Sequence, residues 1–448
     1  MPTSSQLLAK FAAELALSDV PAAAAERAKD CIIDAVGIAI FGSQLPWGRM
    51  VADYARRYGG EGPCALLGFP DTRVHAPCAA LANGVFAHAF EHDSFRDPSV
   101  GAHPGATVLP AVLAACEETG ADGATALTAF VAGCEVLFRV GKAAHQSGTS
   151  PERTGFHAPG LTGPYGAAAA AARVYGLDAG QITHALGIAG SLSSGLLAFT
   201  KSKQGGNLKR LHMGRTAESG ILAARLASAG YTGPETVLDG KFGFLEVFCR
   251  DGDPSAFTAG LGDEWETARI GLKRYPCHMS ASTAVQAIRE LMTQHRFDGS
   301  DVQSLVVEGT DKLAHHPHLA EPGDIGQAQY SVPFCVALAL FRDPENPRSF
   351  DAAALADPAI RALCRSIVIR KGERAWPSAW STRVIVRLKD GRELTGNGDW
   401  VNGMLVKPLS RAELRNKFML VTDALGTAAS ARLFDRLEHM ESDVRFSV

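Results

Sequence analysis

Residues 163–177 read GPYGAAAAAARVYGL, with six consecutive alanines and almost no variation in polarity along the stretch. Alanine is the residue that favours the α-helix most strongly. A helix that is apolar around its whole circumference is normally buried on all sides. The stretch therefore predicts a central helix surrounded by other helices, in a mainly α protein.

Further helical patterns extend outward from this stretch on both sides. Pro21 and Gly42 delimit the first, since proline favours a helix start and glycine a helix end. The other patterns cover residues 75–93, 123–145, 178–195 and 212–234. No strand pattern of any length interrupts the first 250 residues. We therefore expect a large all-α domain over residues 1–267.

The sequence changes character after about residue 268. Residues 301–311, DVQSLVVEGTD, alternate and are rich in valine, which is typical of a strand. Residues 381–397 predict a β-hairpin with a type I′ turn at Asp390-Gly391. Helical patterns cover residues 281–295 and surround 329–341. We expect a smaller α+β domain over 268–404, while the helices of about 405–448 pack back on the first domain or close the second.

The composition excludes several classes of protein. The hydrophobic fraction is 46%, the charged fraction 20% and the net charge −3, which indicate a globular protein without the basic field that nucleic acid or an anionic membrane would require. No uncharged apolar run reaches the roughly 18 residues of a membrane span. Nine cysteines without a CxxC pair indicate reduced thiols, so we expect a cytoplasmic protein.

Sequence signatures of common active sites are also absent. GxSxG and a GxGxxG after a strand do not occur, which disfavours a serine hydrolase or a Rossmann enzyme. The dense histidine run HHPH, residues 315–318, reads as an exposed loop. We therefore expect no metal site.

Residues 92–106, HDSFRDPSVGAHPGA, place several ionisable side chains between two apolar helical patterns. His103 with Asp93 could form an acid/base pair, because imidazole exchanges protons near neutral pH. Glu91 competes with Asp93 for this role. The alternative is a solvated loop in which Asp93 caps a helix and Arg96 and Asp97 form a surface pair.

Two further polar stretches precede helical patterns. In GFHAPGLTGPYG, residues 155–166, His157 lies where a helix N-terminus could attract an anion. In KSKQGGNLKRLHMG, residues 201–214, the basic residues are dense enough for an anion site; they are Lys201, Lys203, Lys209 and Arg210. The alternatives are a turn whose histidine bonds to the backbone, and an exposed basic loop.

The fourth stretch, GLKRYPCHMSAST, covers residues 271–283 at the change from the first domain to the second. Arg274 could clamp a carboxylate with two hydrogen bonds, and Lys273 could add a point charge. His278 follows Pro276 in the same turn. The alternative is a linking turn whose charges are solvated.

Taken in order, these stretches resemble the MmgE/PrpD family. The resemblance rests on NGVFAHAFEHDSF, GAHPGATVLPAVLA, GFHAPGLTGPYGAAAAAARVYGLDAGQITHALGIAGS, LKRLHMGRTAESGILAARLASAGYTGP and KRYPCHMSAST. The family includes 2-methylcitrate dehydratase, cis-aconitate decarboxylase and iminodisuccinate epimerase. The resemblance implies a large helical domain, a smaller α+β lid domain, an active site between them and a homodimer. It also implies that the protein needs no metal or organic cofactor.

The resemblance implies functional roles for single residues of this chain, each matched to one motif of the family. His103 matches the histidine of the family's H-P motif, and His157 matches that of G-F-H. Lys209 matches the lysine before the L-H pair, Lys273 opens the K-x-[YF]-P segment, and His278 is similar to a histidine of decarboxylase-type members. The family's acidic D-x-D-D run reads EHDS here. Asp93 is its nearest match, and Glu91 is the rival.

These matches imply a lyase that acts on a di- or tricarboxylic acid. Lys209, Lys273 and Arg274 would hold carboxylates and stabilise negative charge. His103, oriented by Asp93, would move a proton, while His157 and His278 would bind substrate or donate the second proton. An epimerase of a dicarboxylate, a non-catalytic carboxylate-binding protein and a helical scaffold remain as alternatives.

Overall fold

The computed structural model describes residues 1–146, 150–202, 206–249, 252–314 and 318–448. The chain forms two compact units, and each is assembled from segments that are not contiguous in sequence. The first unit comprises Met1–Ala89, Asp93–Gly271 and Ala412–Val448, and the second comprises Phe90–His92 and Leu272–Arg411. The expectation of a mainly α fold with strands in the C-terminal part is confirmed.

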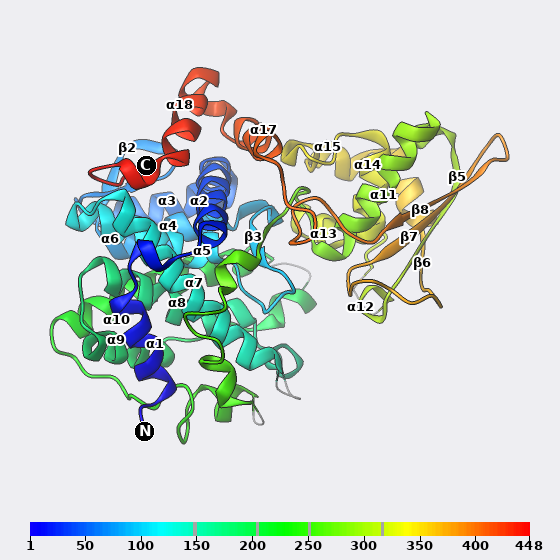
Figure 1. The fold of residues 1–448 in the computed structure, drawn as a ribbon. Coiled ribbons are helices and arrows are strands. Elements are labelled where there is room, and N and C mark those ends of the chain that lie inside the picture. The colour runs from blue at the N-terminus through cyan, green and yellow to red at the C-terminus, as the bar shows by residue number, and fades with distance from the viewer. Residues whose placement is uncertain (147–149, 203–205, 250–251, 315–317) are drawn as a thin grey trace. The chain divides into compact units, whose positions relative to one another are not determined.

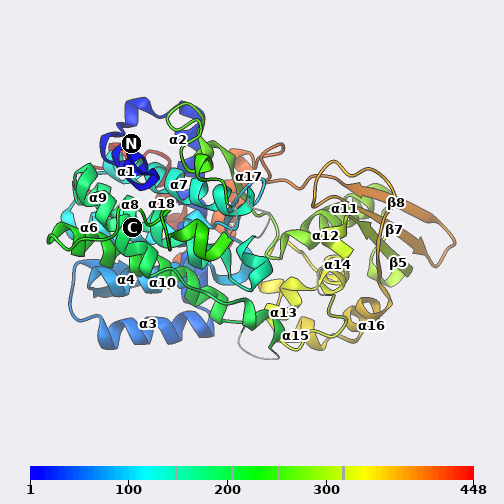
Figure 2. The same ribbon diagram turned by 90° about the horizontal axis from the view of Figure 1, so that it is seen from below.

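Most of the first unit is helical. Its helices are α1 (Ser4–Glu14), α2 (Ala22–Ser43), α3 (Pro46–Tyr58), α4 (Ala76–Ala87), α5 (Pro104–Thr107), α6 (Leu109–Thr119), α7 (Gly123–Gln146), α8 (Ala158–Val174), α9 (Ala179–Ser191), α10 (Leu208–Ser228), α17 (Arg411–Val421) and α18 (Thr427–Glu438). Helix α8 contacts α6, α7, α9 and α10, and lies among them in Figures 1 and 2. Its six alanines are fully buried, as the sequence predicts.

Two helices begin earlier than their sequence patterns indicate. Helix α8 starts at Ala158 and continues through Pro164, so the pattern that opens at residue 163 is its interior. Helix α10 starts at Leu208, which places Lys209 and Arg210 in its first turn rather than in a loop. This earlier start fixes the direction of two basic side chains relative to the helix.

Short strands also occur in the first unit, so the expectation of an all-α domain over residues 1–267 is wrong in this detail. Strands β1 (Cys64–Leu66) and β2 (Phe69–Val74) form an antiparallel hairpin around Gly68, whose φ is +79°. Strand β3 (Ser94–Arg96) pairs with β4 (Ile270–Leu272). These strands have only three to six residues, and the sequence of β2, FPDTRV, is largely polar. The alternation of apolar and polar residues is therefore too short to predict a strand.

Helix α7 is the one helix of the described residues that is long and apolar enough to cross a membrane by length and composition. In the structure 89% of that apolar window is buried inside the protein. It also carries charged groups with specific partners. The Glu135 carboxylate accepts hydrogen bonds from Thr267, and the Arg139 guanidinium donates to the carbonyl of Ala259. Helix α7 therefore serves as a core helix of the first unit.

The second unit is built on a four-stranded sheet of order β6-β5-β7-β8. The strands are β5 (Val302–Gly309), β6 (Val368–Lys371), β7 (Thr382–Leu388) and β8 (Glu393–Gly398). Strands β5 and β6 are parallel, and the other neighbours are antiparallel. The helices are α11 (Met279–His295), α12 (Asp311–Ala314), α13 (Ile325–Tyr330), α14 (Val332–Phe341), α15 (Ala352–Ala356) and α16 (Pro358–Ser366). Helix α11 packs against β7 and β8, and α14 packs against α11 (Figure 1).

The turn between β7 and β8 differs from the predicted type I′ turn. Only Gly391 of the predicted pair has a positive φ, +91°, whereas a type I′ turn needs two. The Leu388 N–H donates to the carbonyl of Arg392, and the Gly391 N–H donates back to the carbonyl of Leu388. The connection is therefore a three-residue loop with glycine in the left-handed position, the second common hairpin solution.

The two C-terminal helices belong to the first unit, while the chain before them, up to Arg411, belongs to the second. Helix α17 is fixed by an ion pair between Lys417 and Asp34 of α2, with 2.6 Å between Nζ and Oδ1. Both side chains are buried. The end of the chain thus returns to one of the first helices that the sequence forms.

Candidate functional site

Asp93 lies at the centre of a buried group of three side chains in the first unit. Its Oδ2 atom is 2.9 Å from Nδ1 of His88 and 2.9 Å from Nδ1 of His103. The two imidazole rings meet edge to face, with 4.7 Å between their centroids. Asp93 and His88 are inaccessible to solvent, whereas the His103 side chain retains 14% exposure. Of the two acids that the sequence left open, Asp93 is the one beside His103.

The local backbone brings these groups together. His88 is the C-cap of α4, and the next turn places Phe90 and Glu91 in the left-handed region, with φ of +74° and +53°. Non-glycine residues adopt that region only where their surroundings stabilise it. The turn carries the chain from α4 into β3, and this reversal points Asp93 back at the helix end that it has just left.

The hydrogen bonds of His103 define which of its nitrogens can accept a proton. Nδ1 lies 2.9 Å from the carbonyl oxygen of Ser94 and 2.9 Å from the Asp93 carboxylate. Both oxygens are acceptors, so Nδ1 carries the hydrogen. Nε2 of the neutral ring then holds the lone pair. His103 is arranged as a general base whose partner stabilises the imidazolium that forms.

The electrostatic setting keeps Asp93 ionised and His88 neutral. Burial alone would raise the pKa of Asp93, but His88 and His103 hold it well below its ordinary value. Burial lowers the pKa of His88 to about 4, against the opposing effect of Asp93. His88 therefore acts as a neutral donor to the carboxylate, which leaves the negative charge available to His103.

Most of the 92–106 stretch is buried rather than solvated. Arg96 and Asp97 are both buried, and Arg96 forms an ion pair with Glu266 rather than with Asp97. Lys142 of α7 binds the second oxygen of the same carboxylate at 3.1 Å. The predicted surface-pair alternative is therefore wrong for these residues. Packing on α7 and the 266–269 turn fixes the segment that follows Asp93.

His88, Asp93 and His103 are also the group of described residues whose geometry could hold a metal ion, since one ligand atom from each lies within 4.8 Å of the others. Two histidines and a carboxylate are suitable ligands for zinc or iron. In the structure, however, both imidazoles bond directly to one oxygen of Asp93. Oδ2 of Asp93 thus accepts from both rings, and this arrangement suits proton transfer without an ion.

A second pair of histidines lies in the same unit. Nδ1 of His157, just before α8, is 3.0 Å from Nδ1 of His212 on α10. Burial lowers the pKa of His157 well below its ordinary value, and Lys209, His212, His103 and His88 lower it further. Helix α10, which carries Lys209 and His212, packs against α8, α4 and α5. The first unit thus gathers three predicted site residues, His103, His157 and Lys209, around one region.

Lys209 and Arg210 are buried, which contradicts the exposed-loop alternative for both. The Arg210 guanidinium lies over the ring of Trp47, 4.6 Å from its centroid. Lys201 is exposed at the end of a short 3-10 helix, and Lys203 lies outside the described residues. The basic residues of this stretch are therefore separated by the fold, and Lys209 is the one whose charge reaches the histidines.

In the second unit, Lys273 and Glu91 form an ion pair with 3.1 Å between Nζ and Oε2. Both residues are 4% exposed, so the linking-turn alternative with solvated charges is wrong for Lys273. The amide of the fully buried Gln329 donates to the carbonyls of Phe90 and Pro276 at 2.7 and 2.9 Å. These bonds fasten residues 90–92 to the segment that carries Lys273.

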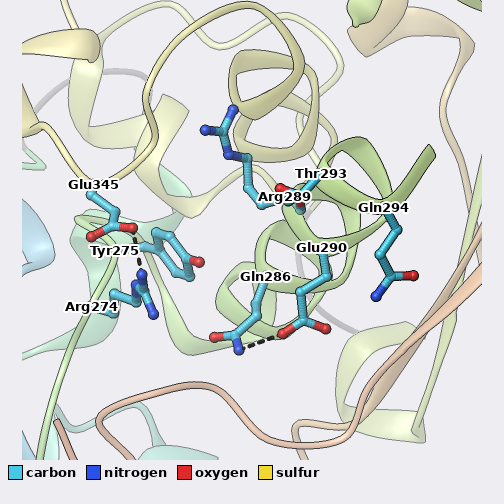
Figure 3. Close-up of a pocket in the computed structure, with 8 residues that line it drawn as sticks. All are labelled: Arg274, Tyr275, Gln286, Arg289, Glu290, Thr293, Gln294 and Glu345. Carbon is cyan, nitrogen blue, oxygen red and sulfur yellow. Dashed lines mark hydrogen bonds and ion pairs between the residues drawn. The ribbon is translucent and has the colours of Figure 1, made fainter. Parts of the chain in front are cut away.

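Arg274 lines a polar cavity of about 320 Å³. Its guanidinium donates to Glu345 at 2.8 Å, and Figure 3 shows this pair at one end of the cavity. Tyr275 lies beside it, and residues of α11 form the rest of the wall; they are Gln286, Arg289, Glu290, Thr293 and Gln294. Lys273 is not among the residues that line this cavity.

His278 caps the N-terminus of α11. Its Nδ1 accepts a hydrogen bond from the backbone N–H of Ser280, so Nε2 carries the hydrogen in the neutral ring. The ring stacks on Tyr330 at 4.8 Å and meets the edge of Trp380 at 5.9 Å. His278 thus presents an N–H donor from an aromatic setting.

Sequence reasoning missed four residues that the structure places in these groups. They are His88, His212, Gln329 and Tyr330. A usable signal existed for His88, because it ends an otherwise apolar helix five residues before Asp93. His212 follows Lys209 at helical spacing, which could have indicated a shared face. Gln329 and Tyr330 gave no local signal, since their partners are distant in sequence.

Comparison with known proteins identifies relatives along the whole chain. A model of the MmgE/PrpD N-terminal domain matches residues 6–256, and a model of the MmgE/PrpD C-terminal domain matches residues 275–440. The cis-aconitate decarboxylase-like protein oryM of Aspergillus oryzae is 27% identical over 98% of this chain and 93% of its own length.

Two further relatives carry the name cis-aconitate decarboxylase. The protein of Homo sapiens is 28% identical over 88% of this chain and 82% of its own length. That of Aspergillus terreus is 29% identical over 74% of this chain and 70% of its own length. The two domain models match consecutive parts of the chain in the order that the family has them, and together they cover most of it. The chain therefore belongs to the MmgE/PrpD family.

Proposed function

We propose that the protein is a lyase that acts on a di- or tricarboxylic acid by proton transfer next to a carboxylate. The relatives named above are cis-aconitate decarboxylases or resemble them, so an unsaturated tricarboxylate is the first substrate to examine. Loss of CO₂ leaves an electron pair on carbon, and a proton must then be delivered to that carbon. Loss of water instead requires a proton to be removed from carbon and another to be given to the departing hydroxyl.

The observation that carries the proposal is the pair formed by Asp93 and His103. A buried, ionised carboxylate 2.9 Å from Nδ1 fixes the ring so that Nε2 accepts a proton, and the 14% exposure of the His103 side chain leaves it reachable. A positioned imidazole of this kind contributes about 10²- to 10⁴-fold to proton transfer. Neither step of the proposed chemistry requires a further oxidant, reductant or organic group.

Lys209 supplies the charge that the proposed chemistry needs. Breaking a bond next to a carboxylate places negative charge on the substrate, and a preorganised cation in a water-poor site stabilises it. Lys209 is 6% exposed and close enough to His157 to lower the pKa of that ring. Lys273 and His278 of the second unit are proposed as further substrate contacts, as a cation and an N–H donor.

The test is incubation with a panel of carboxylates in D₂O, followed by NMR. The panel contains cis-aconitate, 2-methylcitrate and iminodisuccinate. Release of CO₂ identifies a decarboxylase, and a new alkene with loss of water identifies a dehydratase. Deuterium incorporation without net conversion identifies an epimerase. Binding without any of these changes would leave a carboxylate-binding protein, and the absence of both would reject the proposal.

We further propose that the reaction needs no metal ion. The Nδ1 atoms of both imidazoles that could bind one are hydrogen-bonded to Asp93. Protein dialysed against EDTA should therefore retain its full rate with the substrate found above. A loss that added zinc or iron(II) reverses would show that His88, Asp93 and His103 are ligands rather than a proton-transfer group.

A further inference from the structure

His212 makes a contact with His157 that the proposed chemistry has not yet used. The two Nδ1 atoms are 3.0 Å apart, within hydrogen-bond distance. His157 is 7% exposed, while His212, on the first turns of α10, retains partial exposure to solvent. The ring of Phe199 lies against both imidazoles, at 5.6 and 5.9 Å between centroids. The pair therefore links a buried imidazole to one that solvent can reach.

Two nitrogens at this distance share one hydrogen, so one ring donates and the other accepts. Burial lowers the pKa of both rings, and the nearby charge of Lys209 lowers both further. His103 and His88 act on His157 in the same direction. Both rings are thus neutral near pH 7. When Nδ1 of His212 carries the shared hydrogen, Nε2 of His157 must carry the other and is a donor.

We propose that His212 relays protons from solvent to His157, which delivers them to the substrate. The substrate carbanion takes the hydrogen from Nε2 of His157. Nδ1 of His157 takes the shared hydrogen from Nδ1 of His212, and Nε2 of His212 takes a proton from water or a buffer acid. One C–H bond forms, and each ring ends neutral with one N–H, now on its opposite nitrogen. Once the product has left, proton exchange with water returns both rings to their starting tautomers.

This inference rests on the proposed lyase function and makes it more specific. Decarboxylation takes up one proton from solvent in every turnover, whereas dehydration removes one proton from carbon and adds one to the hydroxyl. A buried donor such as His157 must be recharged in the first case. His212 acts through His157 and not on the substrate, so it is a positioning residue rather than a catalytic one.

The experiment compares three variants with wild type on the carboxylate that wild type converts. His212→Ala removes the relay and should lower kcat about 10- to 100-fold with KM within twofold, and imidazole in the buffer should restore the rate. His212→Asn can still donate to Nδ1 of His157 and hold its tautomer, but it cannot pass a proton on. It should therefore be as slow as His212→Ala. His184→Gln is the control, because His184 is a partly buried histidine whose Nδ1 bonds only to the carbonyl of Gly233.

The outcomes separate the relay from the function on which it rests. Wild-type rates in His212→Asn, or a His212→Ala variant that imidazole does not accelerate, overturn the relay and leave the lyase intact. Absence of turnover by wild type rejects the lyase and the relay together. A proton inventory of wild-type kcat in H₂O–D₂O mixtures that requires more than one transferred proton supports the relay, a one-proton dependence opposes it, and neither result depends on the stability of any variant. Melting curves of each variant confirm that it is folded.

Discussion

Asp93 is hydrogen-bonded to two histidines of the first unit, and variants can distinguish its role from that of Glu91. Asp93→Asn removes the negative charge that stabilises a protonated His103, so we expect kcat to fall by about 10²- to 10⁴-fold with a smaller change in KM. Glu91→Gln removes the partner of Lys273 in the second unit. It should lower the melting temperature more than Asp93→Asn does. Steady-state kinetics and thermal melts of both variants check this contrast, and equal kinetic losses would contradict it.

His88 makes stability depend on pH in a predictable direction. Burial lowers the pKa of His88 to about 4, so between pH 6.5 and 4 the unfolded chain binds a proton that the native protein does not. Acidification from pH 7 to 4 therefore removes about 3 kcal/mol of stability through this group. The buried Asp34, whose pKa is raised to about 6, acts in the opposite direction, so wild type alone is not informative.

The comparison that isolates this effect is wild type against His88→Gln. The difference in the free energy of unfolding between the two proteins should shrink by about 3 kcal/mol from pH 7 to pH 4. Urea titrations at several pH values in this range measure it. A difference that stays constant with pH would mean that His88 is not buried as a neutral ring.

At this scale the sequence predicted the partner of His103 only as a choice between two acids. The choice depends on the left-handed turn at Phe90 and Glu91, which sends one acid into each unit. Neither phenylalanine nor glutamate favours the left-handed conformation, so no local sequence pattern predicts this turn. His88 was missed for a related reason. A histidine at the end of an apolar helix is usually a satisfied core residue, so its spacing of five residues from Asp93 was a weak signal until the fold placed the two side chains together.

At the scale of elements, helix interiors were predictable and helix ends were not. The alanine run of α8 is buried as expected. However, α8 and α10 both begin several residues before the starts that the sequence predicts. For α10 this shift matters, since it moves Lys209 from a loop to a helix face that also carries His212. Glycines at 205 and 206 and the dense basic residues concealed the start, because both features are typical of exposed loops.

The attachment of α17 to α2 gives a prediction about elements. Lys417→Met leaves the Asp34 carboxylate in an apolar setting without its closest cation. Removing one partner of a buried pair costs about 3–5 kcal/mol. Lys417 lowers the pKa of Asp34, so without it that pKa rises, and the loss should be largest above pH 7 and smaller near pH 5, where Asp34 takes up a proton. The double variant Asp34→Asn/Lys417→Met should recover most of the stability at pH 7.5, as measured by urea unfolding.

For the whole molecule, composition and periodicity predicted a large helical part followed by an α+β part. In the structure the two compact units meet at residues 271 and 272. The membership of Phe90–His92 in the second unit had no such signal. It depends on Glu91 meeting Lys273 and on Gln329 meeting the Phe90 carbonyl, contacts between residues about 180 and 240 positions apart. Periodicity within a segment carries no information about partners at that distance.

Because residues 90–92 belong to the second unit, Lys273→Met should change stability in opposite directions in the full chain and in a fragment that lacks them. In the full chain, Lys273→Met leaves the buried Glu91 carboxylate without its cation and should destabilise the second unit by about 3 kcal/mol. A fragment of residues 272–411 lacks Glu91, so its buried ammonium has lost that carboxylate. There Lys273→Met should stabilise, because an apolar side chain replaces a charge in an apolar setting. Hydrogen exchange of the β5 and β7 amides reports the stability of this unit in both proteins.

Lys389→Met, an exposed change in the β7–β8 turn, is the control and should have little effect in either. If Lys273→Met destabilises the fragment as much as the full chain, residues 90–92 do not belong to the core of the second unit.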